Sequence, residues 1–286
     1  MRLSFSTRGW VDLSWEEMML TALEMGFSGI EVYNLPKFDP MLDRSGPFHK
    51  YQAAATVRQL REKKLSIPCF DTSYDLSEDS DCVSYLQSLL EVAHNTQVPY
   101  VAACALTDNE EQVVKNLNAL LPVAEKRNVT ILLKTSGIYA DTGRLRNLLN
   151  TFASDNMGAL WDVHHTYRDF GESGDTTIKN LGSYVCHVHL RDSDDSGAYQ
   201  VIGEGTMPID DVMRALSSVN YDGFLSLEWK PEWMEELQDR DVLFPYYVNY
   251  MSRFESPRSQ KKSLYFNHDG SGQYRITLFC CAHWEF

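Results

Sequence analysis

Short runs of β-branched and aromatic residues alternate along this chain with longer stretches in which apolar residues recur every three or four positions. The short runs are typical of buried strands, and the longer stretches are typical of amphipathic helices. The predicted strands cover residues 3–7, 29–33, 66–70, 100–106, 129–134, 157–163, 184–190 and 223–229. The predicted helices cover residues 15–26, 49–64, 81–95, 109–127, 142–154, 175–182 and 208–219, with a terminal helix from about residue 232.

Local signals at the first helix support this assignment. Ser14 is a candidate N-cap, Glu17 stands at the capping-box position, and Gly26 is suited to end the helix. Eight strands, each followed by a helix, indicate parallel strands joined by right-handed crossovers and closed into a barrel. The sequence therefore predicts an α/β protein with a (β/α)8 TIM barrel as a single domain. A doubly wound open sheet is the alternative, but no GxGxxG motif follows the first strand.

Composition narrows the class of protein. The chain has 286 residues, of which 43 % are hydrophobic, so it can bury a large core. The net charge of −14 disfavours nucleic acid and anionic membranes as partners. No run approaches the roughly 18 apolar residues of a membrane helix, and the N-terminus lacks a signal-peptide pattern. The six cysteines form no CxxC pair, so we expect reduced thiols in a cytoplasmic protein.

The predicted barrel indicates where along the chain site residues are expected. Active sites of such barrels lie at the C-terminal ends of the strands, and several of these ends are polar here. Burying so many ionisable groups without pairing or metal ligation costs several kcal/mol each, so the convergence needs an explanation. The candidates are Glu31, Lys134, Asp162, His164, His165, His187, His189, Arg191, Asp192, Glu228 and Lys230.

Several of these residues also have an ordinary structural explanation. His187 and His189 alternate with Val188 and Leu190, and we expect one of the two, His189, to face the barrel interior. Asp162 is able to cap the turn that follows its strand. Glu228 and Lys230 are spaced as a same-face ion pair on a strand.

Three segments carry a family resemblance. GALWDVHHT, HVHLRD and LSLEWK occur in this order at the ends of strands six, seven and eight, and GEG follows at 203–205. Over residues 1–256 the chain resembles the xylose isomerase-like barrel superfamily of sugar-phosphate isomerases and epimerases. The resemblance implies a divalent metal (Mn, Mg, Zn or Co) held by a Glu, an Asp, a His and a Glu on strands five to eight. Asp162, His189 and Glu228 match the last three of these ligands.

The first ligand position does not match, because Lys134 stands where the family pattern has a glutamate. An ammonium group cannot ligate a metal and repels one. The sequence leaves open a three-ligand metal site and a metal-free site in which Lys134 supplies the positive charge. In the second case Lys134 is a catalytic candidate, either as an electrophile or through a Schiff base.

The resemblance also suggests roles for other residues. Glu228 is the expected acid/base residue, and His165 matches a histidine that contacts a substrate hydroxyl. Glu31, Arg191 and Trp10 are further candidates for substrate contact. Aromatic residues near the same rim suit the apolar faces of a sugar; they are Trp10, Tyr33, Phe70, Trp161 and Trp229.

The expected function is a sugar or sugar-phosphate isomerase or epimerase that moves a proton next to a carbonyl. A dehydratase or lyase on the same scaffold and a non-catalytic sugar-binding domain are the alternatives. Residues 257–286 are predicted to be a C-terminal extension that opens with the linker-like PRSQKKS and ends in an apolar, cysteine-rich tail. The tail leaves open a homo-oligomer contact, and the resemblance leaves open a link to an adenylate-forming ligase domain.

Overall fold

The computed structural model describes residues 1–35, 39–79, 81–234, 239–254, 265–268 and 274–277. Two compact units are present, Met1–Tyr250 and Met251–Phe286. The second unit contains an antiparallel pair, β11 (Tyr265–His268) and β12 (Tyr274–Thr277). The predicted domain boundary between residues 256 and 257, and the stretch PRSQKKS, lie outside the described residues.

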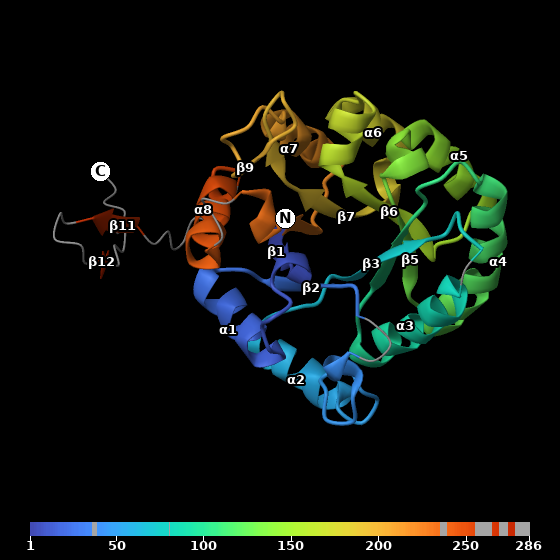
Figure 1. The fold of residues 1–286 in the computed structure, drawn as a ribbon, viewed down its shortest axis with the longest axis horizontal. Coiled ribbons are helices and arrows are strands. Elements are labelled where there is room, and N and C mark those ends of the chain that lie inside the picture. The colour runs from blue at the N-terminus through green and yellow to red at the C-terminus, as the bar shows by residue number, and fades with distance from the viewer. Residues whose placement is uncertain (36–38, 80, 235–238, 255–264, 269–273, 278–286) are drawn as a thin grey trace, which may run out of the picture. The chain divides into compact units, whose positions relative to one another are not determined.

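The first unit is a closed barrel of parallel strands, as predicted (Figure 1). Neighbouring strands pair in the order β1-β10-β7-β6-β5-β4-β3-β2, and β2 returns to β1. Since β8 (Asp192–Ser193) and β9 (Tyr199–Gln200) form a separate hairpin, the eighth barrel strand is β10. The barrel strands are β1 (Arg2–Ser6), β2 (Gly29–Tyr33), β3 (Cys69–Asp75), β4 (Tyr100–Cys104), β5 (Thr130–Lys134), β6 (Met157–Asp162), β7 (Val185–Leu190) and β10 (Phe224–Leu227).

Helices form a ring outside these strands (Figure 1). The predicted capping box at α1 is confirmed, because Ser14 and Glu17 exchange hydrogen bonds and Gly26 ends the helix with a φ of 85°. The helices are α1 (Trp15–Met25), α2 (Ala53–Lys63), α3 (Cys82–Thr96), α4 (Glu110–Arg127), α5 (Thr142–Phe152), α6 (Gly174–Leu181), α7 (Ile209–Ser218) and α8 (Arg240–Ser252). Within the described residues, none of them has the length and apolar character needed to cross a membrane.

Two predicted boundaries differ most from the structure. The terminal helix begins at Arg240 rather than near residue 232, because Pro231–Trp233 form a short 3-10 turn and Met234 is extended. Strand β3 runs from Cys69 to Asp75, whereas the apolar pattern ended it at Phe70. Pairing with β4 carries the strand past its apolar run, and Thr72 donates a hydrogen bond of 2.7 Å to the carbonyl of Ala102. Polar residues of β3 therefore enter the barrel wall.

The barrel interior is apolar toward the N-terminal ends of the strands and polar toward their C-terminal ends. Cys69, Ala102, Leu132 and Leu160 pack together as a fully buried cluster. Above them, the parallel register aligns Asp162 with His189 and His189 with Ser226. Paired residues of neighbouring strands point to the same face of a sheet, so these polar side chains share one level of the interior. The candidate site sits on this level and on the one above it.

Candidate active site

Four carboxylates and three cations meet at the C-terminal ends of the barrel strands. Each carboxylate is at most 3 % exposed, which requires a compensating partner for each of them. The carboxylates are Glu31 on β2, Asp71 on β3, Asp162 on β6 and Glu228 directly after β10. The cations are Arg8 after β1, Lys134 at the end of β5 and Arg191 directly after β7. The structure thus brings together most of the predicted site residues and adds Asp71 and Arg8.

Glu31 is held by two histidines of β7. Its Oε2 contacts Nε2 of His187 and lies 2.8 Å from Nε2 of His189. The expectation that only one histidine faces the interior is therefore wrong, because residues two apart on a strand share a face. Burial by itself raises the pKa of Glu31, but the two imidazoles more than offset this and hold that pKa well below its usual range. Glu31 is therefore an ionised structural partner of β7.

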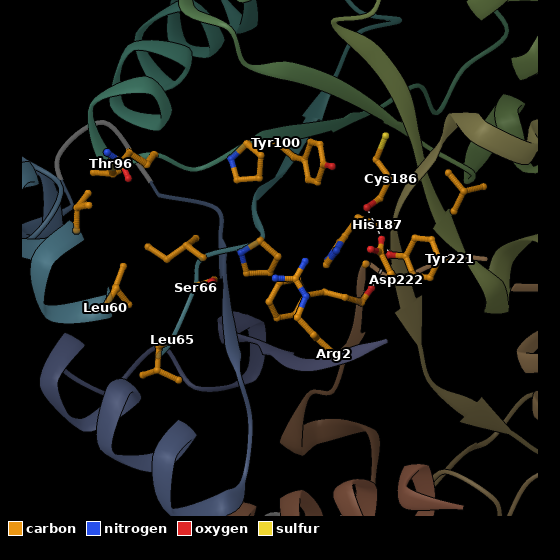
Figure 2. A pocket seen from close by; sticks show the side chains of 18 of the residues that line it. Arg2, Leu60, Leu65, Ser66, Thr96, Tyr100, Cys186, His187, Tyr221 and Asp222 are labelled. Carbon is orange, nitrogen blue, oxygen red and sulfur yellow. Dashed lines mark hydrogen bonds between the residues drawn. The ribbon is translucent and has the colours of Figure 1, made fainter. Parts of the chain in front are cut away.

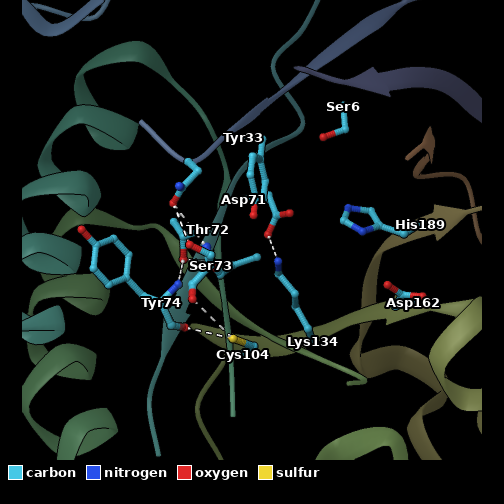
Figure 3. Close-up of polar contacts among 12 residues, drawn as sticks. Ser6, Tyr33, Asp71, Thr72, Ser73, Tyr74, Cys104, Lys134, Asp162 and His189 are labelled. Atoms are coloured by element: carbon cyan, nitrogen blue, oxygen red, sulfur yellow. Dashed lines mark hydrogen bonds and ion pairs between the residues drawn. The ribbon is translucent and has the colours of Figure 1, made fainter. Parts of the chain in front are cut away.

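Lys134 forms an ion pair with Asp71. The Lys134 Nζ atom lies 2.5 Å from Asp71 Oδ1, and Figure 3 shows the ammonium group pointing toward that carboxylate. Burial by itself lowers the pKa of Lys134, but the adjacent Asp71 reverses this and the pKa is raised. A protonated amine is not a nucleophile, so the structure disfavours the Schiff-base alternative. Asp71 was missed because the predicted strand ended one residue before it, although a polar residue at a strand end is the signal used for the others.

Arg191 bridges two of the predicted metal ligands. Its Nη2 donates hydrogen bonds of 3.1 and 2.9 Å to the two oxygens of Asp162, and its Nη1 contacts Glu228. Arg8 contacts the other oxygen of Glu228. Burial by itself raises the pKa of Asp162, but the charge of Arg191 holds it below its usual range. Glu228 thus pairs with Arg8 and Arg191, and the pair with Lys230 that the spacing allowed is absent from the described contacts.

His165 stands at the edge of this cluster. Its backbone N–H donates to Asp162 Oδ1 at 3.2 Å, so Asp162 also caps the turn after β6 as one alternative anticipated. The His165 Nδ1 atom contacts Asp169, which orients the ring and leaves Nε2 3.8 Å from Asp162. About a third of the His165 side chain is exposed. An oriented, accessible imidazole of this kind is suited to meet a substrate.

Asp192, the last residue of the HVHLRD segment, organises the following loop instead of joining the cluster. Its buried carboxylate accepts hydrogen bonds from the backbone N–H groups of Ser193, Gly203, Gly205 and Met207. A Cβ at position 205 would stand only 2.1 Å from Asp192 Oδ1. The GEG segment therefore has a packing reason, since its second glycine lets the loop close over Asp192.

Most of the predicted aromatic wall belongs to the core. Trp10 is 4 % exposed, and its ring packs edge-on against Phe244 with centroids 5.3 Å apart. Phe70, Trp161 and Trp229 are also fully buried. Only Tyr33 keeps partial exposure, beneath the guanidinium of Arg8 at 5.0 Å.

A second aromatic pair lies near the same cations and was not predicted. Trp233 stacks on Tyr199 with centroids 4.1 Å apart, and the Arg191 guanidinium lies 5.6 Å from the Trp233 ring. Both rings are partly exposed. Neither residue closes a barrel strand, so the rule used for the other site residues could not find them. Tyr199 lies in the β8–β9 hairpin, and Trp233 lies in the 3-10 turn after β10.

A metal site requires ligand atoms close together. Among the residues that the structure describes, two groups bring carboxylate and imidazole atoms within 4.8 Å of one another: Glu31, His187 and His189, and Asp71, His189 and Glu228. In the first group both histidines bond to Glu31. In the second, Lys134 holds Asp71 and two arginines hold Glu228. Asp162, the other ligand that the resemblance implies, is in neither group and is bound by Arg191. The side chains therefore do not fit the implied four-ligand metal site.

A separate hollow of about 620 Å³ lies at the opposite end of the barrel (Figure 2). Its lining includes Arg2, Tyr100, Cys186, His187 and Tyr221, from or beside the N-terminal parts of the strands. His187 lines this hollow and also contacts Glu31, but the candidate cations lie at the other strand ends. The strand ends, rather than this hollow, define the candidate active site.

Part of the chain is similar in sequence to a curated epimerase. Fructoselysine 3-epimerase of Escherichia coli O157:H7 is 24 % identical over 131 residues, which are 44 % of this chain and 47 % of the epimerase. The chain thus spans about half the length of that curated relative.

Solved structures of several proteins share the fold, among them the two that follow. The probable 3-DHS dehydratase AsbF of Bacillus anthracis superimposes with a TM-score of 0.72 at 17 % identity, covering 87 % of this chain and 99 % of that one. The IolI protein with a bound zinc atom superimposes with a TM-score of 0.72 at 18 % identity, covering 90 % and 100 %. At such identities the likeness concerns the fold.

The sequence matches one family over most of its length. The match covers residues 20–243 and the family is described as the xylose isomerase-like TIM barrel. It spans seven of the eight barrel strands, from β2 to β10, and all the candidate site residues except Arg8 and Trp10. The chain therefore belongs to the xylose isomerase-like TIM barrel family.

Proposed function

We propose that this protein is an isomerase or epimerase that moves a proton on the carbon next to a carbonyl of a small sugar-like substrate. The observation that carries the proposal is the buried carboxylate of Glu228, which faces two guanidinium groups at the mouth of the barrel. A carboxylate is a general base suited to such a proton transfer, and the two guanidinium groups supply the cations that the negative charge developing on the substrate needs.

The neighbouring residues suit the other requirements of this chemistry. His165, oriented by Asp169, is partly exposed and supplies a group that can bond a hydroxyl or exchange a proton. Tyr33 and Trp233 offer partly exposed ring faces beside Arg8 and Arg191, which suits the apolar face of a sugar. Cys69, Cys104 and Cys186 carry free thiols, which is consistent with a reducing compartment such as the cytoplasm.

A dehydratase on the same scaffold is the second candidate. The fold it shares with a probable dehydratase favours this candidate, and the first step would be the same proton removal. The two reactions differ in the fate of the hydroxyl group, which stays on the product of an isomerase and leaves as water from a dehydratase. A domain that binds sugars without turnover is the third candidate.

The test is proton exchange in deuterium oxide. The protein is incubated with a panel of ketoses, aldoses and their phosphates, and NMR follows deuterium incorporation and product identity. Glu228→Gln removes the proposed base while keeping its shape. Glu91→Gln is the matched control, because Glu91 forms a partly exposed ion pair with Arg127 on the outer helices.

We expect one substrate to gain deuterium with the parent protein and with Glu91→Gln, and a loss of at least about 100-fold with Glu228→Gln. Loss of water with exchange would identify the dehydratase instead. Binding without exchange on any substrate would exclude both enzymatic proposals in favour of the sugar-binding domain.

A further inference from the structure

We propose that Arg191 and Lys134 take the place of the divalent metal in this barrel, so that the site holds a substrate oxyanion with side-chain cations alone. The catalytic consequence rests on the proposed function, whereas the statement about metal binding does not. Three observations carry it: the position of Arg191, the pairing of Lys134 and the balance of buried charge.

Arg191 contacts two of the carboxylates that an implied metal ion would need. Asp162 and Glu228 are two of the three ligands that the family resemblance retains, and both carboxylates are occupied by the same guanidinium. A guanidinium is planar, always charged and offers several N–H donors, so it can join two carboxylates as a metal ion does. A metal at this point would have to break a buried charge-assisted contact of Arg191.

Lys134 excludes the ion from the other side. It stands on β5, at the position of the missing glutamate, and its ammonium is fixed by Asp71 from β3. Its charge would repel a metal bound to the nearby His189 and Glu228, with which Asp71 forms the second grouping. The lysine that stands in place of the glutamate on β5 is thus paired with a buried carboxylate on β3. Such compensation is expected if the lysine has a function of its own, and it is not expected if the site has merely lost a metal ligand.

Most of the buried negative charge is already compensated without a metal. Three side-chain cations face Asp71, Asp162 and Glu228, and the remaining carboxylate, Glu31, is bonded by two imidazoles. A divalent ion would leave uncompensated positive charge in a region where every carboxylate is at most 3 % exposed. Uncompensated buried charge costs several kcal/mol.

The same cations define the kind of substrate. An ammonium has three donors, and Asp71 takes one of those of Lys134, which leaves donors for an oxygen of the substrate. Proton removal next to a carbonyl places negative charge on that oxygen, and a fixed ammonium and guanidinium stabilise it. The substrate class is accordingly an α-hydroxy carbonyl compound whose enediolate is bound without metal.

The experiment measures metal content, which is independent of turnover. The full chain is produced in medium supplemented with Mn, Zn and Co, desalted, and examined by elemental analysis and by titration with Mn²⁺. The double variant Lys134→Glu/Arg191→Leu restores the missing carboxylate and frees Asp162 and Glu228. Lys115→Glu/Arg214→Leu makes the same change in net charge at exposed positions, where both cations sit in solvent-facing ion pairs.

We expect less than about 0.1 metal ion per chain in the parent protein and in the surface control, and about one ion per chain in the site variant. If the site variant fails to fold, the metal content of the parent protein still tests the proposal. One ion per chain in the parent that is lost in His189→Ala overturns the proposal. Absence of metal combined with absence of proton exchange would refute the proposed function but not the replacement of the metal.

Discussion

The buried ion pair between Lys134 and Asp71 allows a quantitative test of the site. Its Nζ and Oδ1 atoms are 2.5 Å apart, and the two side chains are 11 % and 0 % exposed. At an effective dielectric constant of about 20, the attraction of unit charges at this separation is about 7 kcal/mol. Removing one partner leaves the other buried without compensation, for which the usual cost is about 3–5 kcal/mol.

The perturbation is a double-mutant cycle with Lys134→Met and Asp71→Asn. Each single change should lower the free energy of unfolding by about 3–5 kcal/mol, because one buried charge is left alone. The double change should cost clearly less than the sum, since neither charge remains. We expect a coupling energy of at least about 2 kcal/mol from urea unfolding followed by circular dichroism.

A matched cycle at the surface provides the control. Lys115 and Asp79 are also an ion pair, at 3.6 Å, but their side chains are 66 % and 85 % exposed. Solvent screening should reduce their coupling to less than about 0.5 kcal/mol. Additive costs at Lys134 and Asp71, comparable with this control, would refute the buried pair and with it the explanation for a lysine on β5.

Three further results are expected. Asp192→Ala should lower the free energy of unfolding by about 3 kcal/mol or more in urea titration, because four backbone donors lose their acceptor; a change below about 1 kcal/mol would contradict that role. Cys104 and Cys186 should react with iodoacetamide far more slowly than free cysteine at pH 8 and faster as pH rises, because burial raises the pKa of each thiol to about 11; peptide mass spectrometry measures this, and rapid labelling at pH 8 would count against it. Borohydride with candidate ketoses at pH 7 should leave Lys134 unmodified, since Asp71 overcomes the effect of burial and raises the pKa of its amine; an adduct on Lys134 by mass spectrometry would show that a Schiff base forms.

The barrel itself was predictable because it depends on local patterns. Apolar runs and helical spacing located eight strands and the helices between them, and the capping box at Ser14 was found from its own four residues. The errors arose where contacts distant in sequence decide the outcome. β3 continues to Asp75 because β4 lies beside it, and the helix after β10 is delayed until Arg240.

The candidate site was predictable as a set of positions. Polar residues that close apolar strands of a barrel must meet at one rim, so Glu31, Lys134, Asp162, His189 and Glu228 could be named from the sequence. The same rule could have named Asp71 and Arg8, which directly follow the predicted strands 66–70 and 3–7. Trp233 and Tyr199 could not be found in this way, because they reach the site from a turn and a hairpin.

The sequence by itself determined the barrel, the strand ends at which the candidate site lies and the unusual lysine on β5. Only the tertiary structure decided which charges pair. Lys134 and Asp71 are 63 positions apart in the chain, and Arg191 meets Asp162 and Glu228 from a third strand end. Pattern and spacing report the face on which a side chain lies, whereas the partner of a buried charge depends on distances across the barrel that are set only when the strands close.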